Sequence, residues 1–342
     1  MRDVLPELER WAAEGLAAAT ATVVRTERSA PRAPGAVLGV SERGEVVGSV
    51  TGGCVEPAVY EEAREVLSGA PPRLVTYGIA DEEAFEVGLP CGGTVHIFVD
   101  ALDPGLLPAL SEALAAERPV ALVVPVSGPE AGRKRLVFAD QPAADGKLEE
   151  AARTTLARGE STLVTAEGVD VFVQSFAPRP QLYVFGAVDH AAAIARQGRF
   201  LGYRVTVCDA RAKFATPERF PEADELVVEW PDRFLADAPV DVRTAICVLT
   251  HEERFDVPLL QIALRTPAGY IGAMGARRTN ERRAERLREA GVSDEAIARI
   301  HAPIGLDIGS RTPEEVAVSV AAEIVAVMRG KAAALRPAQV AS

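Results

Sequence analysis

Hydrophobic positions in the first half of the chain change repeatedly between helical and strand-like spacing. Apolar residues recur at helical spacing over 5–19, and short apolar runs bounded by turn residues follow. The runs predict strands at 21–25, 36–40, 45–50 and 94–99, helices at 55–67, 106–117 and 147–157, and hairpins formed by 119–126 with 135–139 and by 163–165 with 169–175. This mixture predicts an α+β domain.

A regular alternation of strands and helices begins after the segment Ala177-Pro178-Arg179-Pro180, which has the composition of a linker. The pattern predicts strands at 181–185, 204–208, 225–229, 244–249 and 270–272, and helices at 191–201, 257–266, 281–290 and 316–328. For the last helix, Thr312 and Glu315 predict a capping box. Such alternation indicates an α/β domain with a parallel sheet. We therefore expect two domains, 1–176 and 177–330, and a frayed tail at 331–342.

Composition and charge exclude several classes of partner. The 342 residues are 48% hydrophobic and 25% charged, with a net charge of −12 and a pI near 5.0. This acidic balance disfavours nucleic acid and anionic membranes. The chain has no run of 18 apolar residues and no leader-like start, so we expect no membrane span. Cysteines at 54, 91, 208 and 247 fit neither zinc nor disulfide spacing, which favours a cytoplasmic protein with free thiols.

Two of these cysteines stand in glycine settings that suggest chemistry. Gly52 and Gly53 precede Cys54 at a predicted strand-to-helix junction, and Cys91 is followed by two glycines. Flanking glycines let a backbone approach a ligand, and free N–H groups at a helix start lower the pKa of a thiol. The alternative is a small residue buried in a tight turn. Glu56 could cap the helix or act in acid–base chemistry, with capping favoured.

The remaining cysteines have a simpler interpretation. Cys208 and Cys247 lie within apolar strands, so we expect both in the core.

The first strand–turn–helix of the second domain has the layout of a Rossmann dinucleotide site. Gly186 opens the turn, and Asp209 follows the second strand, where an acid would bind a ribose hydroxyl. Val188 stands where a glycine normally admits the pyrophosphate. The pattern therefore predicts a Rossmann-like sheet without NAD(P) binding.

A candidate anion site follows a later strand of the same domain. Gly272 and Gly275 lie in a strand-to-helix turn that continues into Arg277 and Arg278. Free N–H groups at a helix start and forked guanidinium donors both suit phosphate. The alternative is a solvated helix start capped by Thr279 or Asn280. The spacing leaves both open.

The sequence resembles the XdhC/CoxI family in motifs spread over nearly the whole chain. The matching segments are GSVTGGCVE, GLPCGG, VFGAVDHAAAIA, YIGAMGARRT and APIGLDIGSRTPEEVAVSVAAEIV. The resemblance implies a maturation factor, typically dimeric, for molybdenum hydroxylases of the xanthine and carbon monoxide dehydrogenase type. Such factors bind and shield molybdenum cofactor, help it acquire its terminal sulfur with a cysteine desulfurase, and deliver it to the apo-enzyme.

The resemblance also assigns residues. The family cysteine implicated in cofactor binding maps onto Cys54, and the GLPCGG cysteine maps onto Cys91. The family's Gly-Ala-Gly-His turn reads Gly-Ala-Val-Asp-His here, so a nucleotide role does not carry over.

Together these observations predict a site that carries molybdenum cofactor as cargo in a cleft between the domains, with Cys54 near the metal and Arg277 and Arg278 at the phosphate. The candidate residues are Gly52, Gly53, Cys54, Glu56, Cys91, Gly186, Asp209, Gly272, Gly275, Arg277 and Arg278. The competing hypotheses are an NAD(P)-dependent oxidoreductase and a protein adaptor that holds no cofactor.

Overall fold

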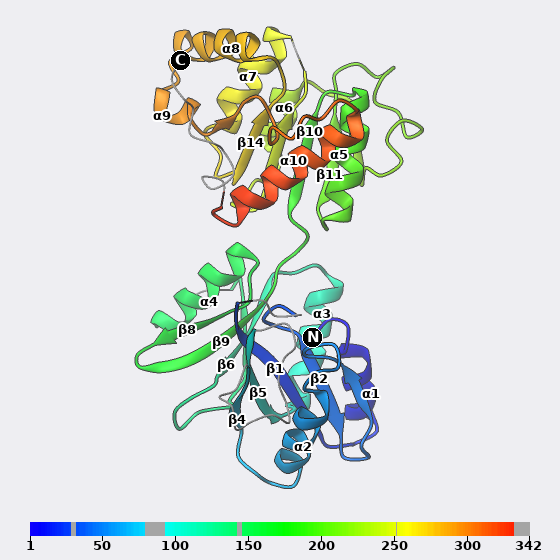
Figure 1. The fold of residues 1–342 in the computed structure, drawn as a ribbon, viewed down its shortest axis with the longest axis vertical. Coiled ribbons are helices and arrows are strands. Elements are labelled where there is room, and N and C mark those ends of the chain that lie inside the picture. Colours follow the sequence, from blue (N-terminus) through cyan, green and yellow to red (C-terminus); the bar gives the residue numbers. More distant parts are fainter. Residues whose placement is uncertain (29–31, 79–92, 142–145, 251, 332–342) are drawn as a thin grey trace. The chain divides into compact units, whose positions relative to one another are not determined.

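The computed structural model describes residues 1–28, 32–78, 93–141, 146–250 and 252–331. The chain forms two compact units, Met1–Pro178 and Arg179–Ser342 (Figure 1). None of the helices in the described ranges is long and apolar enough to cross a membrane.

The first unit contains a five-stranded antiparallel sheet in the order β3-β2-β1-β5-β4. Its strands are β1 (Ala18–Glu27), β2 (Val37–Ser41), β3 (Val46–Gly48), β4 (Arg73–Tyr77) and β5 (Thr94–Ala101). Alternate residues of β1 and β5 pack with α2 (Glu56–Leu67) in one core cluster. The opposite face contributes to a second cluster with α1 (Leu5–Ala13) and α3 (Leu107–Ala115), which follows the short 3₁₀ turn η1 (Pro104–Leu106).

A smaller sheet completes this unit, in the order β7-β6-β9-β8. Its elements are β6 (Val120–Pro125), β7 (Arg135–Phe138), α4 (Lys147–Arg158), β8 (Thr162–Ala166) and β9 (Val169–Phe176). The antiparallel pairs β6–β7 and β8–β9 confirm both predicted hairpins. One face of the sheet packs on α4, and the other joins the cluster around α1 and α3.

The second unit is built on a six-stranded parallel sheet in the order β12-β11-β10-β13-β14-β15. Its strands are β10 (Gln181–Phe185), β11 (Arg204–Cys208), β12 (Glu225–Val227), β13 (Ala245–Val248), β14 (Tyr270–Ala273) and β15 (Ile300–His301). Its helices are α5 (Asp189–Phe200), α6 (Pro231–Asp237), α7 (Glu253–Ala263), α8 (Arg277–Glu289), α9 (Asp294–Ile297) and α10 (Pro313–Met328). The strand order reverses between β10 and β13, the position at which Rossmann-type sheets bind ligands. The predicted Rossmann-like parallel sheet is thus confirmed.

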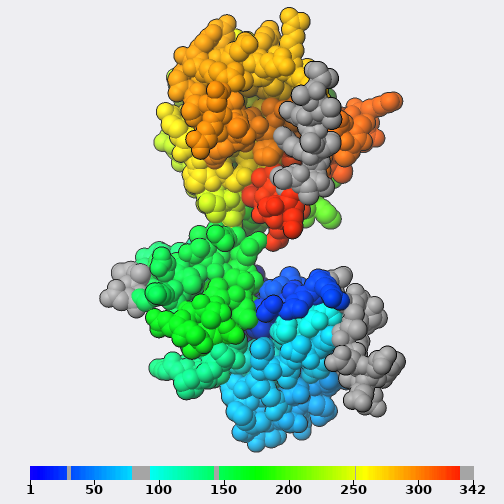
Figure 2. All heavy atoms as spheres, turned by 60° about the vertical axis from the view of Figure 1, so that its left-hand side comes forward, coloured from blue at the N-terminus to red at the C-terminus, as the bar shows by residue number. Residues whose placement is uncertain are grey.

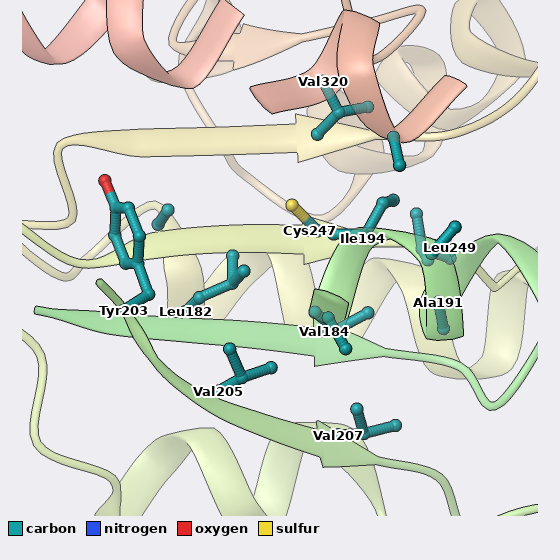
Figure 3. Close-up of a cluster of buried hydrophobic side chains, with 14 of the residues drawn as sticks. Leu182, Val184, Ala191, Ile194, Tyr203, Val205, Val207, Cys247, Leu249 and Val320 are labelled. Carbon is teal, nitrogen blue, oxygen red and sulfur yellow. The ribbon is translucent and has the colours of Figure 1, made fainter. Parts of the chain in front are cut away.

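The two faces of this sheet are covered by different helices. Helices α5 and α10 cover one face, and α6, α7 and α8 pack on the other. Figure 3 shows Val320 of α10, Ile194 of α5 and the sulfur of Cys247 among the buried side chains of this cluster. Cys208 is buried as well, so the predicted core positions of both cysteines are confirmed.

Some predicted boundaries are wrong for local reasons. The helix expected over 5–19 ends at Ala13, because Gly15 adopts a φ of +71° and the amides of Gly15 and Leu16 bond back to Ala12 and Trp11 in a Schellman arrangement. The helix expected from 281 begins at Arg277, since the Asn280 amide already donates to the Ala276 carbonyl. Short elements β4, α6, α9 and β15 lacked a periodic signal.

The last helix starts as predicted. Thr312 accepts from the amide of Glu315 while Glu315 accepts from the amide of Thr312, so the capping box is confirmed.

Candidate functional site

Cys54 lies on a loop that joins β3 to α2, and its side chain is exposed. Gly52 and Gly53 have φ angles of +88° and +125°, which L-residues rarely adopt. A Cβ at either position would meet no atom within 4 Å. The positive φ angles of this loop therefore account for both glycines.

The Glu56 carboxylate holds this loop from the first turn of α2. It accepts hydrogen bonds from the hydroxyls of Ser49 (2.6 Å) and Thr51 (2.7 Å) and from the amides of Val50 (3.2 Å), Thr51 (2.9 Å), Gly52 (2.9 Å), Gly53 (2.8 Å) and Val55 (3.2 Å). A carboxylate at a helix N-terminus is also stabilised by the helix dipole. Glu56 thus organises the loop on both sides of Cys54.

These contacts set the protonation state of Glu56. Burial opposes its ionisation, but the hydrogen bonds from Ser49 and Thr51 outweigh burial and hold the pKa of Glu56 well below its usual range. With its oxygens occupied by these donors, the carboxylate fits the capping role better than acid–base chemistry. The sequence suggested free amides beside Cys54, and that expectation is wrong for the amides bonded to Glu56.

Several chain segments meet at the same edge of the five-stranded sheet. Gly48 at the end of β3 pairs with Leu38 near the start of β2, and Thr94 at the start of β5 pairs with Glu27 at the end of β1. The Arg32 guanidinium donates to the Ser49 carbonyl at 3.4 Å, which adds a positive charge beside the Cys54 loop. Cys91 lies outside the described residues.

Among the described residues, no cluster of metal ligands forms around Cys54. In the part of the chain that the structure describes, no group of three or more His, Cys, Asp and Glu side chains could hold a metal ion. Of the three cysteines that the structure describes, Cys54 is the exposed one, and it lies on a loop fixed by Glu56. That arrangement suits a donor to a metal that arrives with its own ligands, as a carried cofactor does.

The Rossmann turn of the second unit is closed by its own side chains. Gly186 has a φ of +108°, and a Cβ there would lie 3.0 Å from Thr250 Cγ2, so only glycine fits this turn. The buried Asp209 carboxylate accepts from the Ala187 amide at 2.7 Å, and from the Arg211 amide and guanidinium at 2.8 to 2.9 Å. Val188 is the N-cap residue of α5 and packs against the core.

The Asp209 carboxylate is thus occupied by hydrogen bonds within the protein. Burial opposes its ionisation, but the hydrogen bonds from Arg211 and from the Ala187 amide hold the pKa of Asp209 below its usual value. The structure brings Gly186 and Asp209 together as expected from the sequence, with Arg211 and Ala187 as the partners of the acid. The carboxylate that would bind a ribose hydroxyl in a dinucleotide site is occupied.

The loop between β14 and α8 presents the two candidate arginines. Arg277 and Arg278 are exposed in the first turn of α8, which contains no acidic residue, and neither forms an ion pair with any described residue. The N-cap residue is Ala276, so the predicted capping by Thr279 or Asn280 is wrong. Both residues lie inside the helix, and Asn280 donates instead to the Gly275 carbonyl at 2.9 Å.

The glycines of this loop have structural roles of their own. A Cβ at Gly272 would lie 2.6 Å from Ile304 Cγ1, so this position admits the chain that follows β15. Gly275 has a φ of +141°, a backbone conformation that residues other than glycine rarely adopt.

A buried ion pair that the sequence did not reveal supports this loop. The Arg283 guanidinium lies 2.7 Å from the Asp256 carboxylate, donates to the Met274 carbonyl at 3.0 Å, and also contacts Asn280. Asp256 accepts from the Thr250 hydroxyl as well, and Thr250 packs against Gly186. The network therefore connects the Rossmann turn to the loop that carries Arg277. The partners are 27 residues apart in the chain, and no spacing signal links them.

Comparison with known proteins agrees with this arrangement of a mixed domain and a Rossmann-like domain. Residues 182–324 match the XdhC Rossmann domain, and residues 11–78 match the XdhC and CoxI family. The chain belongs to the XdhC and CoxI family.

Two relatives match over most of their length. A Bacillus subtilis protein named as a probable subunit of xanthine dehydrogenase is 26% identical over 316 residues, covering 90% of this chain and 92% of that protein. The molybdenum cofactor insertion chaperone PaoD of Escherichia coli is 28% identical over 314 residues, covering 92% of this chain and 84% of the relative.

The fold also has a counterpart among solved structures. A Bacillus halodurans protein described as a xanthine dehydrogenase superposes with a TM-score of 0.65 at 24% identity, covering 97% of this chain and 98% of that one. At this identity the similarity establishes the shared fold.

Proposed function

We propose that this protein is a molybdenum cofactor insertion chaperone for a molybdenum hydroxylase of the xanthine or carbon monoxide dehydrogenase type. It binds the cofactor as cargo, shields it and hands it to the apo-enzyme. The observation that carries the proposal is the exposed Cys54 thiol on a loop fixed by Glu56, within the segment that matches the XdhC and CoxI family. The relative named as an insertion chaperone supports the same function.

The chemistry of the described side chains suits this cargo. Molybdenum cofactor is a pterin dithiolene with a phosphate, so it offers a thiophilic metal and an anionic group. A thiolate is a soft ligand for such a metal, and a loop already held by hydrogen bonds loses little entropy on binding. Exposed Arg277 and Arg278 supply forked donors for phosphate. We assign Cys54 to the metal and the two arginines to the phosphate.

Cofactor retention tests the assignment of Cys54. The protein and its Cys54→Ser variant are purified from cofactor-producing cells, and molybdenum and pterin are measured per chain. We expect the serine variant to lose most of the cofactor, while Glu61→Gln, an exposed change on α2, retains it. Equal retention by wild type and Cys54→Ser would exclude an essential ligand role.

The arginine pair is tested in the same assay. Replacing Arg277 and Arg278 by alanine should weaken binding by more than ~1 kcal/mol for each charged hydrogen bond lost. The matched control replaces Arg282 and Arg286, which lie further along α8, and removes the same number of charges. If both double variants bind alike, the N-terminal arginines do not recognise the phosphate.

Two protein partners belong to this proposal. A cysteine desulfurase would provide the terminal sulfur of the cofactor, and the apo-hydroxylase would receive the sulfurated cofactor. Free thiols such as Cys54 persist in reducing compartments, so we assign the exchange to the cytoplasm. Reconstitution of an apo-hydroxylase with loaded protein, with and without desulfurase and cysteine, should show activity only when sulfur transfer is possible.

The oxidoreductase alternative has little support at its expected site. Val188 replaces the pyrophosphate-facing glycine, and Asp209 is bonded to Arg211 and Ala187. Titration with NAD, NADP and molybdenum cofactor separates the two functions. We expect saturable binding of molybdenum cofactor alone, and tight NAD(P) binding would favour the oxidoreductase.

A further inference from the structure

Trp230 gives the second unit an exposed aromatic surface at the carboxyl edge of its sheet. It follows β12, is the N-cap residue of α6, and is 42% exposed. The carboxyl ends of the parallel strands lie along this edge, where Rossmann-type folds bind their ligands. Tryptophan is strongly buried on average, so an indole left open at this edge is a candidate contact for a ligand.

Phe255 supports the indole from the side of the protein. It is 5% exposed near the start of α7, and its ring centre lies 4.9 Å from that of Trp230 at an interplanar angle of 55°. Tilted aromatic pairs at this spacing are favourable beyond the area that they bury. The contact therefore holds part of the indole against the protein, while the rest stays open to solvent.

The charges next to this aromatic pair are balanced within the protein. The Arg254 guanidinium lies 4.6 Å from the centre of the Phe255 ring and forms an ion pair with Glu252 at 2.6 Å. By contrast, the first turn of α8, which carries two arginines, contains no acidic residue. The surface at Trp230 thus suits a flat ring, and the start of α8 suits a phosphate.

Helix α7 connects the aromatic pair to the loop between β14 and α8. Three strands separate β12 from β14, but Phe255 belongs to the helix that follows β13, the neighbour of β14. The next residue, Asp256, pairs with Arg283 at 2.7 Å. Arg283 in turn donates to the Met274 carbonyl in that loop at 3.0 Å. The same buried network therefore fixes both surfaces on one side of the sheet, with α8 visible in orange at the surface in Figure 2.

On the basis of the proposed function, we propose that Trp230 stacks on the pterin ring of the molybdenum cofactor whose phosphate we assign to Arg277 and Arg278. The cofactor combines a flat heteroaromatic ring with an anionic group. The second unit offers an aromatic surface and a cationic helix start on one side of its sheet. Stacking needs only the face of the ring, so no dedicated hydrogen-bond partner is required at Trp230.

Tryptophan fluorescence tests the stacking without altering the protein. The chain contains two tryptophans, and Trp11 is fully buried in the first unit. We expect molybdenum cofactor to quench the emission of the wild type, and the quenching to be lost in Trp230→Phe, which keeps Trp11. Cofactor binding without quenching, or equal quenching in Trp230→Phe, would overturn the proposal.

Cofactor affinity provides the second test. Trp230→Ala should weaken binding by about tenfold or more, and Trp230→Phe by less, because phenylalanine keeps a smaller ring for stacking. The matched control is Phe200→Ala, which removes an 83% exposed ring at the end of α5 and should bind as the wild type does. Circular dichroism checks that each variant folds. Equal losses in Trp230→Phe and Trp230→Ala would exclude stacking.

The results distinguish stacking from the proposed function as a whole. If wild type and Trp230→Ala retain the same amount of cofactor, the stacking is wrong and the proposed function stands. If the wild type itself retains no cofactor, both are wrong. If Trp230→Ala retains cofactor but no longer transfers it to the apo-hydroxylase, Trp230 contacts the enzyme instead of the pterin, which also overturns the stacking.

Discussion

The carboxylate of Glu56 lies 2.8 Å from the amide nitrogen of Gly53, in a loop where Gly53 adopts a φ of +125°. The residue that follows, Cys54, is thereby presented on a backbone that a neighbouring acid holds in place. Hydrogen bonds that hold the backbone around a reactive side chain position that side chain more precisely than a free loop could. The two residues therefore have different roles. The exposed Cys54 thiol can contact a ligand, and the Glu56 carboxylate holds the loop through hydrogen bonds.

Replacing Glu56 by glutamine should loosen the Cys54 loop. The neutral side chain cannot accept all of the donors that the carboxylate satisfies, and we expect a loss of about 1–3 kcal/mol in the free energy of unfolding near neutral pH. Chemical denaturation measures this loss. Glu61→Gln, on the solvent side of the same helix, is the matched control and should change stability by no more than ~0.5 kcal/mol.

The effect of Glu56→Gln on stability should also depend on pH. Folding lowers the pKa of Glu56, so its ionised form stabilises the fold above the ordinary glutamate pKa of about 4.3. This contribution is lost as the pH falls toward the lowered value. The stability difference between wild type and Glu56→Gln should therefore shrink between about pH 5 and about pH 2. A difference that stays constant over this range would argue against a stabilising charge.

The stability cost of replacing Gly52 should depend on the backbone conformation that the new residue must adopt. Its φ of +88° disfavours L-residues, but a Cβ would meet empty space. We expect Gly52→Ala to cost about 1–2 kcal/mol and Gly52→Asn to cost less, because asparagine enters the left-handed region more readily. Thermal unfolding of the two variants measures the difference. Equal losses would indicate that the side chain, and not the backbone, limits this position.

Thiol labelling should distinguish the cysteines. Cys54 is exposed, whereas burial raises the pKa of Cys208 to about 12 and also raises that of Cys247. In a Cys91→Ser background, a maleimide should modify one thiol of the native protein and all three after denaturation. Mass spectrometry of peptides identifies the site. Rapid native labelling of Cys208 or Cys247 would contradict the buried positions.

Breaking the Asp256–Arg283 pair should destabilise the second unit. Asp256→Asn leaves a buried guanidinium without its counter-charge, which typically costs about 3–5 kcal/mol. Replacing both residues by apolar side chains of similar size should cost less than the single change. Denaturation of the single and double variants gives the comparison. A double variant less stable than the single one would show that the pair contributes net stability.

The sequence predicted the architecture through its hydrophobic spacing. Apolar runs located β10 and β11 at their observed bounds, and the Thr312–Glu315 pair located the start of α10. These features depend on contacts within a few residues, where periodicity and capping are decisive. Elements of two to seven residues, such as β15 and α6, were missed because pairing with distant strands or packing against them decides their formation.

The candidate site was only partly accessible to sequence reasoning. The motif around Cys54 and the arginines of α8 could be selected because glycines and charges in a turn are visible in the chain itself. The sequence could not predict that Asp209 pairs with Arg211. An acid after the second strand has the same spacing whether it binds a ribose or an arginine.

By itself, the sequence determined the change from a mixed helix-and-strand pattern to a parallel α/β pattern and the turns that could carry chemistry, because local spacing and turn composition encode both. Only the tertiary structure decided how the polar groups are used. It turned the amides around Cys54 toward Glu56 and buried Arg283 against Asp256. It also left Trp230 exposed at the edge of the parallel sheet. Hydrogen-bond partners and exposure depend on neighbours that are distant in the chain, and folding alone brings them together.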